Sequence, residues 1–192
     1  GQLTVETPVI HIAGNGTADE IKFTNEYIPA PISGDIIGNK IYQQNIAGSL
    51  TDKVFEAGQF SFSLYNSDEN WSTGSLIQRV DNKADGTFKF DTLTFTKAGT
   101  YYYLVNEYHG GTTINGIVYD STVYRIKVVI EDNKTGNLVA TIHLYDGGNV
   151  PKDAITFNNH YTFTSSDNAV ISGVKVLENK ALEAGKFEFV LT

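Results

Sequence analysis

The feature that most constrains the fold of this chain is an internal repeat. Residues 56–64 (EAGQFSFSL) recur as residues 183–191 (EAGKFEFVL), and residues 23–27 (FTNEY) recur as residues 157–161 (FNNHY). Self-similarity at a long period is typical of proteins in which one structural unit is copied along the chain. The sequence is therefore expected to hold parts of more than one copy of the same domain.

The spacing between the copies shows that one copy is longer than the other. Asn159 follows Asn25 by 134 residues (159 − 25), whereas Glu183 follows Glu56 by only 127 (183 − 56). The first copy therefore carries an insertion, which we place near residues 47–53.

We predict one complete domain at residues 28–161. Residues 1–27 are expected to be the C-terminal part of a preceding repeat, and residues 162–192 the N-terminal part of a following one. A third repeated motif, Gly38-x-Lys40 and Gly173-x-Lys175, agrees with this division. Partial copies lack most of their own sheet, so we expect them to be less ordered than the centre unless they pair with another strand. Adjacent repeats of the same polypeptide are the expected partners.

Short aromatic and alternating runs predict an all-β central domain. Eleven Tyr and eleven Phe stand beside many Thr, Val and Ile, and such side chains suit a pleated, half-buried surface. Clusters of Gly, Asn and Asp separate the runs, as expected for turns. Seven or more short strands at this spacing indicate a β-sandwich. A short helical turn is expected only near residues 45–53. The expected strands are 59–64, 87–90, 93–96, 99–107, 122–130, 138–144 and 154–161.

Charge and composition exclude several classes of function. The formal net charge of −8 opposes binding to phosphate backbones, so nucleic acid is not an expected partner. The absence of Cys removes disulfides and thiolate metal sites. No apolar run approaches the roughly 18 to 20 residues that span a bilayer, so we expect no membrane insertion in this segment.

The sequence also gives no sign of a metal or another cofactor. Residues 81–86 (DNKADG) superficially resemble a calcium loop, but Lys83 occupies a position where a ligand is expected, so a hairpin turn is the better interpretation. No nucleophile elbow or phosphate loop is present, so we do not expect a multiple-turnover enzyme. The four histidines also lack metal-ligand spacing: His11, His109, His143 and His160.

Several motifs stand together in a characteristic order. They are Gly38-x-Lys40, EAGxFxFxL at 56–64, DGTFxF at 85–90, GTYYYxxxE at 99–107, Tyr119-Asp120 with Tyr124, and FxNxY at 157–161. In this combination the central domain resembles the Gram-positive pilin isopeptide-linkage domains, the FctA-type repeats of major pilins and related surface adhesins. The resemblance implies an immunoglobulin-like (CnaB-type) β-sandwich, a structural stalk role and a location at the cell surface or cell wall.

The resemblance also implies a spontaneous amide bond between a lysine on the first strand and an asparagine on the last, assisted by a glutamate. Carried onto this sequence, these residues are Lys40, Asn159 and Glu107. The flanking copies hold Asn25 and Lys175 as equivalents without their own partners, so neither is expected to cross-link within its own fragment.

The chemistry of these residue types supports such a bond. A lysine attacks a carboxamide only as the neutral amine, and burial lowers its pKa because the charged form loses hydration. Burial raises the pKa of a carboxyl group, so Glu107 is expected to be protonated and to donate a hydrogen bond to the Asn159 carbonyl. It can then relay the amine's proton to the departing ammonia.

Two neighbouring residues offer alternatives within this scheme. Lys53 is a rival nucleophile because the insertion separates Lys40 from the strand at 59–64. Asn158 adjoins Asn159, but the alternation of side chains along a strand sends the two to opposite faces, and the repeated Phe-x-Asn-x-Tyr spacing selects Asn159.

A different class of function stays open beside the stalk. An extracellular binding module without a cross-link would present the loops around Trp71 or His109 to a glycan or host protein. A host or surface ligand can also be bound through other domains of the same protein. The ordinary interpretation of Trp71 is packing over one end of the sandwich.

Overall fold

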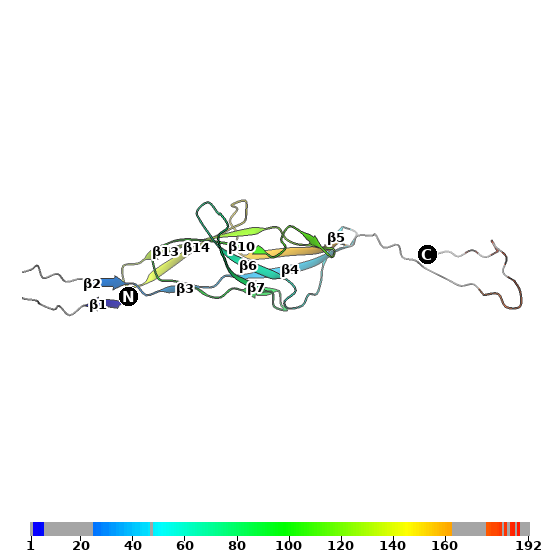
Figure 1. The fold of residues 1–192 in the computed structure, drawn as a ribbon, viewed down its shortest axis with the longest axis horizontal. Coiled ribbons are helices and arrows are strands. Elements are labelled where there is room, and N and C mark those ends of the chain that lie inside the picture. The colour runs from blue at the N-terminus through cyan, green and yellow to red at the C-terminus, as the bar shows by residue number, and fades with distance from the viewer. Residues whose placement is uncertain are drawn as a thin grey trace, which may run out of the picture.

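The structure is a computed structural model and describes residues 2–5, 25–46, 48–162 and 176–181, with positions 183, 185, 186 and 188. These residues hold strands and turns and no helix. Figure 1 shows the long strands running together along the long axis of the molecule. The strands are β1 (Gln2–Val5), β2 (Asn25–Ile28), β3 (Ile32–Gly34), β4 (Ile37–Ile46), β5 (Ser49–Asp52), β6 (Ser61–Ser67), β7 (Leu76–Asp81), β8 (Thr87–Lys89), β9 (Leu93–Phe95), β10 (Gly99–Glu107), β11 (Thr113–Ile114), β12 (Ile117–Val118), β13 (Val123–Asp132), β14 (Leu138–Tyr145) and β15 (Ile155–Thr162).

One layer of the fold is an antiparallel sheet with the strand order β14-β13-β10-β6-β7. Along β13 the side chains alternate between buried and half-buried positions, as the period of two requires for a strand with one face on the core. Its buried residues are Tyr124, Ile126, Val128 and Ile130. This alternation fixes which face of the sheet meets the second layer.

The second layer has the strand order β11-β12-β15-β4-β5, and β8 pairs with the start of β4, on the same edge as β5 and opposite β15. Strands β4 and β15 are parallel neighbours, in register from the pair Gly38 and Ile155 to the pair Asn45 and Thr162. They lie near the two ends of the central domain in sequence. A parallel pair cannot be joined by a tight hairpin, and here the rest of the sandwich forms the connection.

An aromatic core fills the space between the two layers. The rings of Phe62 and Phe88 stack with centroids 3.8 Å apart, and Phe157 lies 5.3 Å from Phe62. All three are almost fully buried. Since β6, β8 and β15 supply these rings, the core joins both sheets, and the domain is an immunoglobulin-like β-sandwich as the sequence predicted.

Two small sheets lie beside the main layers. Strands β3 and β9 pair with each other, as do β1 and β2. The segment around β2 contacts the hairpin between β13 and β14. The Tyr27 hydroxyl donates a hydrogen bond to Asp132 at 3.3 Å, and Ala30 forms an isolated β-bridge with Asn137. Most of residues 1–27 and 162–192, the two predicted partial copies, lie outside the described residues.

The predicted strand at 99–107 is confirmed as β10, and the one at 154–161 matches β15 to within one residue at each end. The helical turn predicted near 45–53 is wrong. There β4 turns back into β5, with Ile46 opposite Ser49 and Gln43 opposite Asp52. Residue 47 lies outside the described residues, and Gly48 follows it with a positive φ of 88°, a conformation that glycine adopts readily. The insertion therefore extends a hairpin.

Strand β7 was not predicted from the sequence. It pairs with β6 at the edge of the five-stranded sheet, and most of its side chains are exposed. Without a buried face it has no clean alternation of apolar and polar residues.

Candidate cross-linking site

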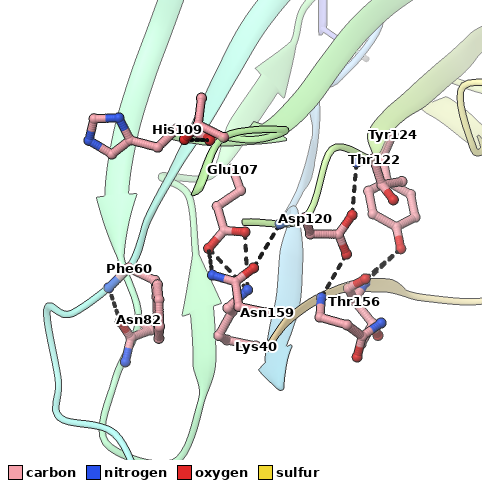
Figure 2. Close-up of polar contacts among 12 residues, drawn as sticks. Lys40, Phe60, Asn82, Glu107, His109, Asp120, Thr122, Tyr124, Thr156 and Asn159 are labelled. Carbon is pink, nitrogen blue, oxygen red and sulfur yellow. Dashed lines mark hydrogen bonds and ion pairs between the residues drawn. The ribbon is translucent and has the colours of Figure 1, made fainter. Parts of the chain in front are cut away.

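Lys40, Glu107 and Asn159 meet in the interior of the sandwich (Figure 2). Their exposed fractions are 4%, 2% and 1%, in a protein where most charged side chains reach solvent. They come from β4, β10 and β15, so both sheets contribute to the cluster. The structure brings together all three residues that the resemblance implied.

The alternation of each strand aims these side chains inward. On β15, Phe157 and Asn159 are buried while Asn158 between them is exposed. On β4, Lys40 and Tyr42 are both buried. The expectation that Asn158 and Asn159 face opposite sides is therefore confirmed.

The register of the parallel strands makes Lys40 and Asn159 diagonal neighbours. Lys40 stands opposite Phe157, and Asn159 stands opposite Tyr42, two residues farther along the same face. Long side chains two positions apart on adjacent strands can reach each other. The backbone pairing alone thus brings the amine and the amide into one region of the core.

Glu107 contacts both of the other side chains. Its Oε1 lies 3.0 Å and its Oε2 3.1 Å from the Lys40 Nζ. The Asn159 Nδ2 donates to Glu107 Oε1 at 2.8 Å. One carboxylate therefore holds the amine and the amide nitrogen at once.

The carbonyl oxygen of Asn159 is held by a different group. The backbone N–H of Asp120 donates to Asn159 Oδ1 at 2.8 Å. Because a backbone N–H can only donate, it requires the oxygen rather than the nitrogen of the Asn159 amide on its side. The expected hydrogen bond from Glu107 to this carbonyl is therefore wrong: Glu107 accepts from the nitrogen, and Asp120 donates to the oxygen.

Burial shifts the pKa values of the two charged groups toward their neutral forms. Desolvation lowers the pKa of Lys40 to about 8 from 10.5, although the Glu107 carboxylate opposes this shift. Desolvation likewise raises the pKa of Glu107, against the opposing attraction of Lys40 and the hydrogen bond from Asn159. Both directions agree with the expectation from the sequence and favour a neutral amine beside a neutral acid.

An aromatic cluster packs against the amine through Phe60. The Lys40 Nζ lies 4.8 Å from the centroid of the Phe60 ring. Phe60 itself packs edge-on against Tyr42 at 5.2 Å and against Tyr119 at 5.9 Å. These rings supply the low-dielectric surroundings that desolvate the amine.

Two glycines explain the Gly-x-Lys and Asp-Gly motifs. A Cβ on Gly38 would fall 2.2 Å from the Phe88 ring, which occupies that space and packs against Phe62. Gly86 has a φ of +84°, and a Cβ there would fall 2.7 Å from the Lys40 carbonyl oxygen. The Lys40 N–H donates to the Gly86 carbonyl at 2.8 Å. Both glycines thus let the core close tightly around the Lys40 strand.

The structure places the rival lysine elsewhere. The Lys53 Nζ lies 5.3 Å from the ring centroid of Tyr161 and 5.8 Å from that of Tyr42. No hydrogen bond joins it to Glu107 within the described residues. Of the repeat equivalents, Asn25 begins β2, and Lys175 lies outside the described residues.

The loops considered for ligand binding show packing contacts. The Trp71 ring meets Tyr102 edge-on at 5.3 Å, and Arg125 lies 5.5 Å from its centroid. His109 lies 3.9 Å from the Tyr108 ring. Among the described residues no three histidine or carboxylate side chains gather in a metal-binding arrangement. In the same part of the chain, no helix is long and apolar enough to cross a membrane.

Sequence reasoning missed the part played by the segment after β12. Asp120 fixes the Asn159 carbonyl, and the Tyr124 hydroxyl donates to the Thr156 carbonyl at 2.8 Å. The Thr156 N–H donates back to the Tyr124 hydroxyl at 3.0 Å. Tyr119-Asp120 and Tyr124 were visible as part of the motif series, but their contacts depend on the path of the loop.

No curated protein matches this chain significantly. Among solved structures it is similar to a major pilin from Streptococcus pyogenes, with 20% identity and a TM-score of 0.43, over 66% of this chain and 50% of that chain. The T-13 major pilin of the same organism shows 19% identity and a TM-score of 0.43, over 68% and 53%. The T3.2 major pilin shows 17% identity and a TM-score of 0.42, over 66% and 52%. The chain thus spans about half the length of these pilins.

A protein family described as FctA, Spy0128-like isopeptide containing domain, matches residues 38–162. The matched segment includes most of β4 and all of β15, and it contains Lys40, Glu107 and Asn159. It covers well over half of the chain. The chain therefore belongs to the family of Spy0128-like isopeptide-containing domains.

Proposed function

We propose that this chain is a structural stalk repeat of a Gram-positive surface adhesin or pilin-like protein, strengthened by a self-made amide bond between Lys40 and Asn159. The observation that carries the proposal is the buried Glu107 carboxylate, which contacts the Lys40 amine and the Asn159 amide nitrogen together. A buried ion pair is weak evidence for stability alone. The presence of the Asn159 amide beside this ion pair supports a reactive role for the cluster.

The contacts support a balanced sequence of proton and bond changes. The Lys40 ammonium gives one proton to Glu107, which leaves a neutral amine. Nζ then attacks Cγ of Asn159, so an Nζ–Cγ bond forms and the carbonyl electron pair moves onto Oδ1. Glu107 carries the next proton from Nζ to Nδ2, the Cγ–Nδ2 bond breaks, and ammonia departs with the remaining proton as ammonium.

Positioning supplies much of the rate in this scheme. Holding two reacting groups in contact replaces an improbable encounter with a local step. Burial also keeps water away from the amide, which protects it from hydrolysis. The product stays in the fold, so each molecule reacts once and the chain is not an enzyme in the multiple-turnover sense.

The strand arrangement suits a load-bearing role. Strands β4 and β15 are parallel, so the chain enters the pair at Ile37 and leaves it at Thr162, at opposite ends. Tension between these points acts along the strands. A bond from Lys40 to Asn159 would carry that tension past the 118 residues between them, residues 41–158.

The proposed function implies a cellular location and a set of partners for the chain. We assign residues 28–161 to one complete repeat, with parts of neighbouring repeats on either side. Adjacent repeats of the same polypeptide are then its main partners, at the cell surface or in the cell wall. The net charge of −8 would keep neighbouring stalks apart by mutual repulsion.

Intact mass spectrometry tests the proposal. The purified chain is expected to be lighter than its calculated mass by one ammonia, whereas Lys40→Ala, Glu107→Ala and Asn159→Ala should each have their full mass. Lys53→Ala is the matched control and should still lose ammonia. A full-mass unsubstituted chain would refute the cross-link and favour a binding module.

A further inference from the structure

We propose that the backbone N–H of Asp120 stabilises the negative charge that develops on the Asn159 carbonyl oxygen, and that the Asp120 side chain positions this N–H. The inference rests on the proposed Lys40–Asn159 cross-link and deepens it. It assigns to a loop residue a role that neither Lys40 nor Glu107 can fill.

The Asp120 N–H already points at the atom where charge will appear. Its nitrogen lies 2.8 Å from Asn159 Oδ1, and the Asn159 side chain is almost fully buried. When the amine adds to Cγ, the carbonyl electrons move onto this oxygen. A hydrogen bond from a preorganised backbone donor strengthens as the negative charge on the oxygen grows. In a site without water, the donor does not have to reorient during the reaction.

Glu107 cannot supply this stabilisation in the observed arrangement. Its Oε1 accepts from Asn159 Nδ2 and also lies beside the Lys40 Nζ. Its task is therefore on the nitrogen side of the amide. The acid–base group and the carbonyl donor approach the same amide from two sides, as Figure 2 shows.

The Asp120 carboxylate fastens its own loop to the reacting strand. Its Oδ2 accepts from the Asn158 N–H at 2.7 Å, and its Oδ1 accepts from the Thr122 N–H at 2.8 Å. Asn158 directly precedes Asn159. The loop and strand β15 are thus joined twice, once through the Asp120 side chain and once through its N–H, which fixes the donor relative to the amide.

A glycine turn packs the donor against the acid–base group. A Cβ on Gly110 would fall 2.7 Å from the Asp120 carbonyl oxygen and 3.0 Å from the Glu107 carbonyl oxygen. The Gly110 N–H donates to that Glu107 carbonyl at 3.0 Å. The absence of a side chain at Gly110 therefore lets the segments carrying Glu107 and Asp120 lie close together.

The charge of Asp120 works in the opposite direction to its geometry. A negative charge near the site favours the protonated forms of Lys40 and Glu107, and for the amine this is the unreactive form. Removal of the charge alone should therefore speed the reaction. If Asp120 acts by positioning, its replacement should slow the reaction instead, so the two roles predict opposite signs.

The test follows cross-linking in time, because the bond forms only once. The full chain is made by cell-free synthesis, translation is stopped, and intact mass spectrometry records the fraction that has lost ammonia. The decisive variant replaces the Asp120 residue with its α-hydroxy acid, so an ester oxygen replaces the N–H while the carboxylate stays. The matched control carries the same ester at Ser121, whose N–H makes no hydrogen bond within the described residues.

We expect the Asp120 ester to react about 100-fold more slowly than the Ser121 ester, the usual order for loss of one such donor. Asp120→Asn should also react at least several-fold more slowly than the unsubstituted chain, despite the lost charge. Resistance to protease and the fluorescence of Trp71 establish that each variant is folded. Both readouts are taken on the same samples as the masses.

Each outcome separates this inference from the function beneath it. Equal rates for the two esters, or a faster Asp120→Asn reaction, would overturn the role of Asp120 and leave the cross-link intact. An unsubstituted chain that never loses ammonia would refute the cross-link itself, and the role of Asp120 with it.

Discussion

The amide nitrogen of Asn159 lies 2.8 Å from Glu107 Oε1, the same oxygen that lies 3.0 Å from the Lys40 amine. A single oxygen thus stands between the nitrogen that loses a proton in the proposed reaction and the nitrogen that gains one. This relationship and the burial of the cluster lead to tests of stability, acidity, packing and mechanics.

Loss of the cross-link should lower stability substantially. A bond from Lys40 to Asn159 closes a loop comparable to a 100-residue disulfide loop, so Asn159→Ala should lower the free energy of unfolding by roughly 4 to 5 kcal/mol. The expected fall in melting temperature is on the order of 15 °C. Calorimetry with Asn158→Ala as the control checks this, since that exposed neighbour keeps the backbone bond to Asp120. Equal losses in the two variants would contradict the prediction.

The uncross-linked domain should become more stable as the pH rises above 8. In Asn159→Ala the Lys40–Glu107 pair remains, and burial lowers the pKa of Lys40 to about 8 from 10.5. Between these values the unfolded chain holds the proton that the folded chain has released, so raising the pH favours folding. Urea unfolding from pH 7 to 9.5 measures the slope.

The control for that experiment is Asn159→Ala combined with Lys40→Met. Tyrosines that titrate at the upper end of the range contribute to both proteins and cancel in the difference. As the pH rises from 7 to 9.5, the free energy of unfolding of the protein that keeps Lys40 should increase relative to that of the Lys40→Met protein. A constant difference would contradict a lowered pKa for the buried amine.

Gly38→Ala should disturb the core far more than Gly34→Ala. A Cβ at Gly38 would fall 2.2 Å from the Phe88 ring, whereas one at Gly34 meets nothing within 4 Å. Overpacking of this kind typically costs 1 to 3 kcal/mol. Thermal melts of the two variants in the Asn159→Ala background isolate the packing effect. Matching melts would show that Phe88 moves aside without cost.

Mechanical extension should stop at the bond. When the chain is pulled from both termini, the 118 residues between Lys40 and Asn159 should stay folded or looped in the cross-linked chain. In Asn159→Ala the same pull should release about 400 Å more of extended chain, at up to ~3.6 Å per residue. Single-molecule force spectroscopy measures this increment. Full extension of the unsubstituted chain would rule out the covalent path.

Trp71 should not respond to sugars. The centroid of its ring lies 5.3 Å from that of Tyr102 and 5.5 Å from the Cζ of Arg125. Titration of neutral mono- and disaccharides should leave the fluorescence of this single tryptophan unchanged. A saturable change in this fluorescence would favour the glycan-binding alternative.

Much of the site could be predicted because strands impose a simple geometry. The repeated Phe-x-Asn-x-Tyr motif and the period of two selected Asn159 over Asn158, and the structure buries the former and exposes the latter. The resemblance supplied Lys40 and Glu107. All three residues lie on regular strands, where side chains point alternately to opposite faces of the sheet.

The remainder depends on backbone paths that residue types do not specify. The donor to the Asn159 carbonyl is a main-chain N–H, which every residue except proline carries, so no side-chain pattern marks Asp120 for this task. The β4–β5 hairpin escaped notice because its second strand is fully exposed and shows no burial pattern. Edge strand β7 escaped for a similar reason.

The pairing of β4 with β15 has a consequence for the order of events during synthesis. Lys40 and Glu107 leave the ribosome well before Asn159, so the amine and the acid can meet while no amide is yet available to them. Strand β15 must then dock beside β4 before the proposed reaction can begin. A chain that is truncated or stalled before β15 cannot acquire the bond. The cross-link would therefore form only on domains whose translation and folding are both complete, and its presence would distinguish finished domains from unfinished ones.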